Sequence, residues 1–328
     1  EGFWRHEDFH HKEVGVLEAI LAVARPGDPA SVYAAVEEIS LKETWLKVSG
    51  GEKACILDNV LQRHKPKQLL EYGAYVGYTT IRIASQLREW GGKVVSLEMD
   101  PINVAIARNV IEFAGLSNVA TVMIGHSDDS VPVVLENLGE HSLDFVFMDQ
   151  RGTRFHADLQ RLERVQLLTD PCVVIADNVL NPGAPLHVWR VCSMPHYATD
   201  IISLHKFGAP QVRDWVTASV VRGGASYGQD PDEVPELVAL ARGADRFRTK
   251  AKTMPNREVL GEPSEELADL FTNRFAQMGI RPSLAVMTAR EHRDGAVSWL
   301  VQLPPGEAAP SCEDLEYMRS GELRGGHW

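Results

Sequence analysis

Residues 68–80 read QLLEYGAYVGYTT, a short apolar run that leads through a glycine-containing turn into the start of a helical pattern. Four more apolar runs of strand length follow, and segments of helix length lie between them. Buried strands that alternate with helices are typical of a parallel sheet covered on both faces. The sequence therefore predicts an α/β protein with a Rossmann-like, doubly wound, mostly parallel sheet.

The element boundaries are predicted from the apolar period and from breaks at glycine and proline. Strands are expected at 68–72, 93–98, 120–124, 143–148 and 172–176, with helices at 79–90, 101–114, 129–138 and 154–168. Ser31 is expected to cap an earlier helix. The apolar runs at 201–206 and 215–221 are expected to complete the sheet as an antiparallel pair.

Three regions are expected: an N-terminal arm at 1–11, a main α/β domain at 12–222 and a C-terminal extension at 223–328. In the extension, a helix at 264–278 and a hairpin around Asp294-Gly295 indicate ordered structure. The extension carries no recognised chemical motif. It is a candidate contact for a protein partner, but an apolar face on its helix is more often explained by core packing.

The composition excludes several classes of protein. Of 328 residues, 44% are hydrophobic, which is enough to form a core, and no apolar run is long enough to span a membrane. The net charge of -12 argues against a general nucleic-acid-binding protein. The 4 cysteines are scattered without CxxC spacing, so we expect reduced thiols and a cytoplasmic location.

Two carboxylates mark the ends of the first two predicted strands. Glu71 precedes the turn that contains Gly73 and Gly77, and Glu98 ends the second strand. A carboxylate before the turn repels a pyrophosphate and suits a cationic ligand group, and the second acid can hold ribose hydroxyls. This pair favours S-adenosylmethionine over NAD. The alternative is that the acids cap strand ends and the glycines only turn the chain.

A second polar group follows the fourth and fifth predicted strands. Asp149 comes directly after one strand, and Asp177 and Asn178 follow the next. Two carboxylates and an amide oxygen at neighbouring strand ends suit a hard cation, most plausibly Mg²⁺. The alternative is that these side chains cap the helices that follow.

Several of these stretches together resemble catechol O-methyltransferases. The resemblance covers about 12–221 and is carried by PGDPASVYAAVE (26–37), Trp45 with Lys53, LLEYGAYVGYTT (69–80), SLEMDP (96–101), FAGL (113–116), LDFVFMD (143–149) and IADNVLNPGAP (175–185). It implies Mg²⁺ on Asp149, Asp177 and Asn178, and a small-molecule catechol or related diphenol as substrate. The residues that it implies for S-adenosylmethionine are Ser49, Glu71, Gly73, Tyr75, Tyr78, Thr79, Glu98, Met99, Ser127, Asp128 and Gln150.

The sequence departs from this family at the general base. The family has a lysine three residues beyond the first metal aspartate, where this chain has Gly152. Because Arg151 stays protonated, it cannot replace that lysine. The family glutamate expected near 203–207 is also missing. We assign His205 as a substitute base, because histidine is the side chain that ordinarily changes charge near neutral pH.

Three interpretations stay open. The first is an active Mg²⁺-dependent O-methyltransferase, and the second is a non-catalytic descendant that serves as a structural or interaction module. The third keeps the chemistry but places an acidic phenol near Arg151 and Arg154.

Overall fold

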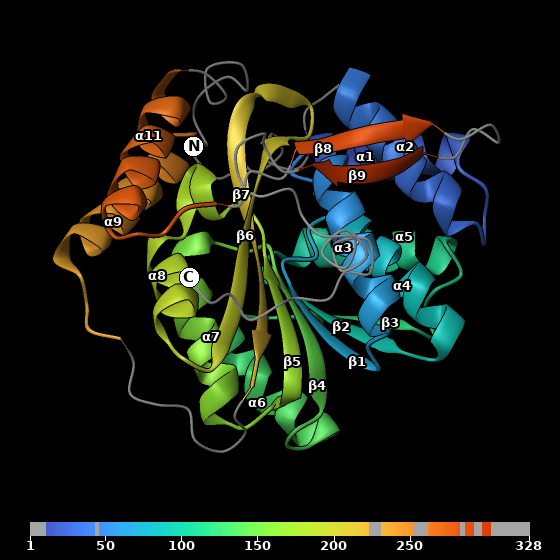
Figure 1. Ribbon diagram of the computed structural model, residues 1–328. Helices are drawn as coiled ribbons and strands as arrows, with labels where there is room; N and C mark the ends of the chain where they lie inside the picture. Colours follow the sequence, from blue (N-terminus) through green and yellow to red (C-terminus); the bar gives the residue numbers. More distant parts are fainter. Residues whose placement is uncertain are drawn as a thin grey trace, which may run out of the picture. The chain divides into compact units, whose positions relative to one another are not determined.

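The computed structural model describes residues 11–42, 46–222, 231–251, 262–282, 286–291 and 297–302 (Figure 1). Most of the predicted arm, Trp45 and Cys312 lie outside these residues. The chain divides into two compact units, Glu1–Ser49 with Lys65–Leu138 and Gly50–His64 with Gly139–Trp328, which we refer to as the first and the second unit. No helix in the described part of the chain is long and apolar enough to cross a membrane.

Seven strands form one sheet in the order β3-β2-β1-β4-β5-β7-β6. The pairs β1–β2, β2–β3 and β4–β5 are parallel, whereas β7 is antiparallel to both β5 and β6. A mostly parallel sheet with an antiparallel edge confirms the predicted fold class.

The first unit contains five helices and three strands among its described residues. They are α1 (His11–Val23), α2 (Pro29–Lys42), β1 (Gln68–Tyr72), α4 (Tyr78–Trp90), β2 (Lys93–Glu98), α5 (Pro101–Phe113), β3 (Ala120–Ile124) and α6 (Ser127–Leu138). The prediction that Ser31 caps α2 is wrong. The helix begins at Pro29, and the Asp28 carboxylate instead accepts the Ser31 N–H at 3.2 Å.

Sequence signals at the strand ends fix where the helices of this unit begin. Asp100 accepts the N–H groups of Ile102 and Asn103 at 2.9 and 3.4 Å, and Pro101 occupies the first helical position of α5. Only two residues therefore separate the end of β2 from the start of α5. This short connection holds Glu98 at the edge of the sheet.

The second unit contains the remaining elements. They are α3 (Glu52–His64), β4 (Leu143–Met148), the 3₁₀ turn η1 (Gly152–Arg154), α7 (Phe155–Arg164), β5 (Leu168–Ala176), the π-helical turn η2 (Val179–Gly183), α8 (Pro185–Ser193), β6 (Tyr197–Lys206), β7 (Ala209–Val221), α9 (Pro235–Ala251), α11 (Glu262–Gln277), β8 (Val286–Glu291) and β9 (Val297–Gln302). The helix predicted at 154–168 ends early, because Gln166 has a φ of 55° and β5 starts at Leu168.

The parallel pairing of β4 with β5 determines where the predicted metal residues begin. Met148 is paired with Ala176, the last residue of each strand. The chain therefore leaves both strands at the same edge, and Asp149 and Asp177 are the first residues after them.

The C-terminal extension contributes helices α9 and α11 to the second unit (Figure 1). The predicted helix at 264–278 and the hairpin β8–β9 are confirmed, whereas α9 was not predicted. Phe271 and Phe275 are fully buried, and the Phe275 ring lies 6.2 Å from that of Trp215 in β7. The apolar face of α11 is therefore part of the core of this unit, although Leu270 is 58% exposed.

Candidate active site

The turn between β1 and α4 places a buried carboxylate at its start. Glu71 Oε2 accepts hydrogen bonds from Thr80 at 2.6 Å and from Ser96, while the buried Oε1 has no hydrogen-bond partner among the described residues. Burial raises the pKa of Glu71 to about 7, against the hydrogen bonds from the two hydroxyls. An unpartnered buried carboxylate oxygen suits a cationic ligand group, so Glu71 fits the ammonium or sulfonium of S-adenosylmethionine.

The turn requires glycine because its backbone adopts positive φ values and because it packs closely against a neighbouring helix. Gly73 and Gly77 have φ values of 98° and 89°, in the left-handed region that favours glycine. A Cβ on Gly77 would lie 3.2 Å from the Ala107 Cα, so the turn packs closely on α5. The turn therefore keeps its backbone next to the end of β1, as a ligand-binding loop of this fold requires.

Glu98 is held by backbone amides at the end of β2. Its Oε2 accepts the Tyr75 N–H and its Oε1 accepts the Asp100 N–H, both at 2.9 Å. The Tyr75 hydroxyl donates to Glu13 Oε1 at 2.6 Å, and burial together with that carboxylate raises the pKa of Tyr75. The predicted ribose-binding acid is thus fixed in place beside the turn that carries Glu71.

The other residues predicted for the cofactor are spread over both units. Ser49 and Thr79 are buried, the Tyr78 hydroxyl donates to Glu37, and Met99 is 61% exposed at the end of β2. Ser127 begins α6, and Asp128 lies in the first turn of that helix. Gln150 belongs to the second unit, where its Nε2 donates to Asp158 at 3.0 Å and its buried Oε1 has no partner among the described residues.

The structure brings the three predicted metal residues together at the ends of β4 and β5. Asn178 Nδ2 donates to Asp149 Oδ1 at 2.7 Å, and the Asn178 N–H donates to Asp177 Oδ1 at 2.6 Å. Asn178 has a φ of 58°, a left-handed conformation that asparagine tolerates better than most residues. We refer to these three side chains as the oxygen cluster.

A buried lysine from α3 lies against the oxygen cluster. Lys53 Nζ is 2.5 Å from Asp177 Oδ1, 2.8 Å from Asp214 Oδ2 and 2.9 Å from Asn178 Oδ1. Burial lowers the pKa of Lys53, but attraction to Asp177 and Asp214 outweighs burial and raises the pKa above its usual value. Lys53 is therefore a fixed positive charge.

The donor set of the oxygen cluster fits a hard divalent cation. Carboxylate and amide oxygens are the ligands that Mg²⁺ takes, and each carboxylate can accept at several lone pairs. The Asn178 amide would have to turn its oxygen toward Asp149, because the amide nitrogen faces that carboxylate here. No group of three or more His, Cys, Asp or Glu in the described residues has metal-binding geometry, and this set contains only two such residues.

A second lysine lies near Asn181, three residues beyond the oxygen cluster. Lys206 Nζ, at the end of β6, donates to Asn181 Oδ1 at 3.1 Å. Asn181 is itself held by Asp214, which accepts the Asn181 N–H at 3.0 Å, and by Ser264 of α11, which accepts from its Nδ2. The side chain of Lys206 is partly exposed, but burial of its ammonium group lowers its pKa to about 8.

Sequence comparison decides the family. A family model for O-methyltransferases matches residues 30–196. Catechol O-methyltransferase B of Danio rerio is 35% identical over 190 residues, which cover 58% of this chain and 72% of that protein. The chain belongs to the catechol O-methyltransferase family. The catechol O-methyltransferase of Bos taurus is 40% identical over 53% of this chain, which spans just under two thirds, 64%, of that protein's length.

A solved structure agrees with the fold. The O-methyltransferase TomG of Streptomyces achromogenes, crystallised in complex with S-adenosylmethionine, has a TM-score of 0.50 and 19% identity. The match covers 64% of this chain and 96% of TomG. The match supports the Rossmann-like fold of this chain.

The position of the family lysine is closed in this chain. Gly152 is buried, and a Cβ built on it would lie 2.8 Å from the Gly183 carbonyl oxygen and 3.1 Å from the Ala184 Cβ. A side chain at 152 would therefore push the backbones of η1 and η2 apart. The loop after β4 cannot supply a base from this position.

The two arginines near Gly152 each form an ion pair with an aspartate. Arg151 lies 2.5 Å from Asp245 of α9, and Arg154 lies 3.7 Å from Asp158. The hydrogen bond to Asp245 raises the pKa of Arg151. The interpretation that places an acidic phenol beside these arginines thus requires displacement of their carboxylates.

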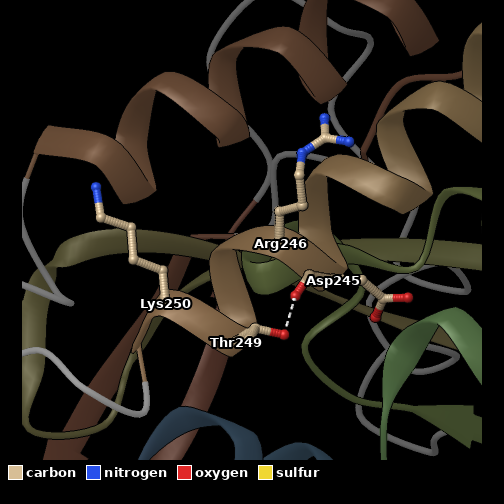
Figure 2. Close-up of a pocket in the computed structure, with 4 residues that line it drawn as sticks. All are labelled: Asp245, Arg246, Thr249 and Lys250. Carbon is tan, nitrogen blue, oxygen red and sulfur yellow. Dashed lines mark hydrogen bonds between the residues drawn. The ribbon is translucent and has the colours of Figure 1, made fainter.

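Helix α9 of the extension reaches the same loop. Arg248 donates to the Gln150 carbonyl oxygen at 3.4 Å, and burial lowers the Arg248 pKa despite the opposing charge of Asp149. A hollow of about 460 Å³ is lined by Asp245, Arg246, Thr249 and Lys250 of this helix. Figure 2 shows Arg246 and Lys250 extending on one side of α9 and the Asp245 carboxylate on another.

His205, the predicted substitute base, has an exposed side chain. The backbone N–H of His205 donates to Glu52 Oε2 at 3.2 Å. Sequence reasoning overlooked Lys206 beside it, as well as Asp214 and Asn181. An acid in the otherwise apolar run at 214–221 was the available signal for Asp214, since a buried carboxylate needs a partner.

Proposed function

We propose that this protein transfers a methyl group from S-adenosylmethionine to a phenolic oxygen of a Mg²⁺-chelated catechol or related diphenol. The observation that carries the proposal is the oxygen cluster, in which Asp149, Asp177 and Asn178 are linked by hydrogen bonds of 2.7 and 2.6 Å. Membership of the catechol O-methyltransferase family supports it.

The methyl donor is assigned to the first unit. The unpartnered Oε1 of Glu71 is proposed to bind a cationic group, and the Glu98 carboxylate is proposed to accept hydrogen bonds from the ribose hydroxyls. The close-packed glycine turn lets the ligand approach the backbone. Gln150 is proposed to lie near the adenine through its unpartnered Oε1.

The metal is assigned to the second unit. When bound, Mg²⁺ favours the ionised diphenol and fixes the positions of its two oxygens. Lys53 orients Asp177, because the ammonium bridges Asp177 and Asp214. The chain thus supplies one charged oxygen ligand, Asp177, whose orientation is set before any ligand binds.

Gly152 favours a second candidate function, a non-catalytic protein that keeps the fold as a structural or interaction module. A protein that had lost catalysis would be expected to lack the family lysine and to have no room for it, as this chain does at position 152. We place this second, because the oxygen cluster and the Glu71 turn are retained.

Methyl transfer from labelled S-adenosylmethionine to a panel of catechols, with and without Mg²⁺, distinguishes the two functions. The enzyme should label a diphenol only with the metal present, and calorimetry should show cofactor binding. Cofactor binding without transfer to any diphenol would favour the non-catalytic module. The cytoplasmic location and the protein partner of the extension stay predictions.

A further inference from the structure

Two lysines lie near the oxygen cluster, and their surroundings differ. Lys53 Nζ contacts two carboxylates, whereas the only hydrogen-bond partner of Lys206 Nζ among the described residues is the amide of Asn181. Lys206 also makes no ion pair with a described carboxylate. The positive charge of Lys53 is thus balanced by neighbouring carboxylates, whereas Lys206 is held by an uncharged amide.

The proposed reaction needs an acceptor for the phenol proton, and the position of the family lysine and the predicted base His205 are the first two places to consider. Gly152 has no side chain, and the exposed His205 side chain belongs to a strand in which successive side chains alternate between faces. The strand pairing is irregular between His205 and Lys206, which leaves Lys206 at the end of β6 beside Asn181.

We propose that Lys206 is the general base for this reaction, which deepens and rests on the proposed function. The phenol O–H bond breaks, its electron pair stays on oxygen, and the proton moves to the Nζ lone pair. The oxygen then forms the O–CH₃ bond while the methyl–sulfur bond breaks and its pair stays on sulfur. Lys206 afterwards releases the proton to solvent, so one proton is released per methyl transferred.

The charges that act on Lys206 support this role. The pKa of Lys206 is lowered to about 8; burial is the largest cause, and Lys53 of α3 and Arg248 of α9 act in the same direction. Asp214 of β7 and Asp177 at the end of β5 oppose them. The neutral amine is therefore available near neutral pH, about one molecule in ten at pH 7.

The position of Lys206 depends on a short chain of hydrogen bonds. Asn181 is 3% exposed, and it is held by Asp214 on its N–H side and by Ser264 on its amide nitrogen. Its oxygen is therefore directed toward Lys206. A neutral acceptor that positions an amine without stabilising the ammonium as strongly as a carboxylate suits a base.

The test compares three variants of the full chain: Lys206→Met, Lys206→Arg and, as a matched surface control, Lys65→Met. Single-turnover methyl transfer to catechol with Mg²⁺ is measured between pH 6 and 10. We expect the first two variants to lose about 10²- to 10⁴-fold at pH 7 and to recover as the substrate ionises unaided at high pH. Lys65→Met should match the wild type, because Lys65 is exposed.

An electron-poor catechol that is already ionised at the assay pH separates a base from a positioning residue. Lys206→Met should transfer methyl to that substrate at nearly the wild-type rate. An equal loss on both substrates, rescue by Lys206→Arg, or a changed pH profile in His205→Gln but not in Lys206→Met would overturn the assignment.

A readout independent of activity is the titration of lysine Nζ groups by NMR in the metal-free protein. We expect one resonance that is missing in Lys206→Met to titrate near pH 8, while that of Lys53 does not titrate below pH 10. A Lys206 resonance that titrates above pH 10 would also overturn the inference. If the wild type transfers no methyl group to any diphenol, the proposed function itself fails, whatever the lysine does.

Discussion

The carboxylates of the two candidate sites, one in each unit, have different kinds of partner. In the first unit, the described partners of Glu71 are hydroxyls and those of Glu98 are backbone amides. In the second unit, Asp177 and Asp214 share the ammonium of Lys53. One site therefore carries uncompensated negative charge, and the other carries charges that are largely balanced.

Under the proposed function, this difference separates cofactor binding from the chemical step. An acidic site without cations attracts a cationic ligand and holds it by charge. A site in which lysines and aspartates alternate instead sets the protonation of each group, because neighbouring charges shift each pKa. We therefore expect mutations in the first unit to change cofactor affinity, and mutations in the second to change turnover and its pH dependence.

The largest effect is expected from Asp177→Ala. Loss of a metal ligand should lower Mg²⁺-dependent methyl transfer by about 10³-fold or more. Unfolding in urea should show a loss of about 3–5 kcal/mol, because Lys53 is left buried with one carboxylate fewer.

The double variant Asp177→Ala/Lys53→Met is the control for this prediction. It should regain neither activity nor stability, because Asp214 would be left buried without the Lys53 ammonium, and cofactor affinity should stay near that of the wild type. Full activity in Asp177→Ala would refute the ligand assignment.

A smaller effect is expected from Glu71→Gln, which tests the uncompensated site. Calorimetry should show S-adenosylmethionine affinity reduced by about 10- to 100-fold. In the wild type, affinity should fall as the pH drops below about 7, because burial raises the Glu71 pKa and the protonated acid no longer attracts a cation.

The pH dependence should be much weaker in Glu71→Gln than in the wild type. Glu89→Gln is the matched control, since Glu89 is exposed on α4 and should leave both affinity and pH dependence unchanged. An affinity that is independent of pH in the wild type would contradict the role of Glu71.

Gly152→Ala should cost about 1–3 kcal/mol of unfolding free energy, because the added methyl group would meet the Gly183 carbonyl at 2.8 Å. Gly15→Ala is the control. Gly15 lies exposed in α1 with nothing within 4 Å of an added Cβ, so alanine should be neutral or slightly stabilising there. Equal stability of Gly152→Ala and the wild type would show that the loop accepts a side chain after all.

The smallest effect is expected for the ion pair between Arg151 and Asp245. A double-mutant cycle with Arg151→Met and Asp245→Asn should give a coupling of about 0.2–1 kcal/mol that weakens with added salt, because Arg151 is 54% exposed. A coupling above about 2 kcal/mol would mean that α9 holds this loop more firmly than an exposed pair can.

Much of the fold was predictable because the strands of the parallel sheet are continuously apolar. The run at 143–148 matches β4 in the structure, and the position of Asp149 follows from it. Where periodicity is weaker, the boundaries were wrong: β5 begins at Leu168 and not at 172, because a left-handed residue at 166 ends the preceding helix. Helix α9 was not predicted, because a glycine and several charged residues interrupt its apolar pattern.

The site was predictable only where the residues follow strand ends. Asp149, Asp177 and Asn178 converge because two parallel strands end together, which spacing alone indicates. Lys206 and Asp214 approach the same point through an antiparallel pair with an irregular register. Since a single-residue shift there moves a side chain to the other face of the sheet, His205 was assigned from the sequence and Lys206 was overlooked.

The contact between Ser264 and Asn181 has a practical consequence for anyone who shortens the chain. A fragment ending at residue 222 would lose the acceptor of a buried amide, at a cost of roughly 1–3 kcal/mol, and would strip the Phe271 ring from Gly183. Such a fragment would keep every motif of the family and yet hold Asn181, and through it Lys206, less firmly. Substrate screening and crystallisation with ligands therefore call for the chain with its extension intact.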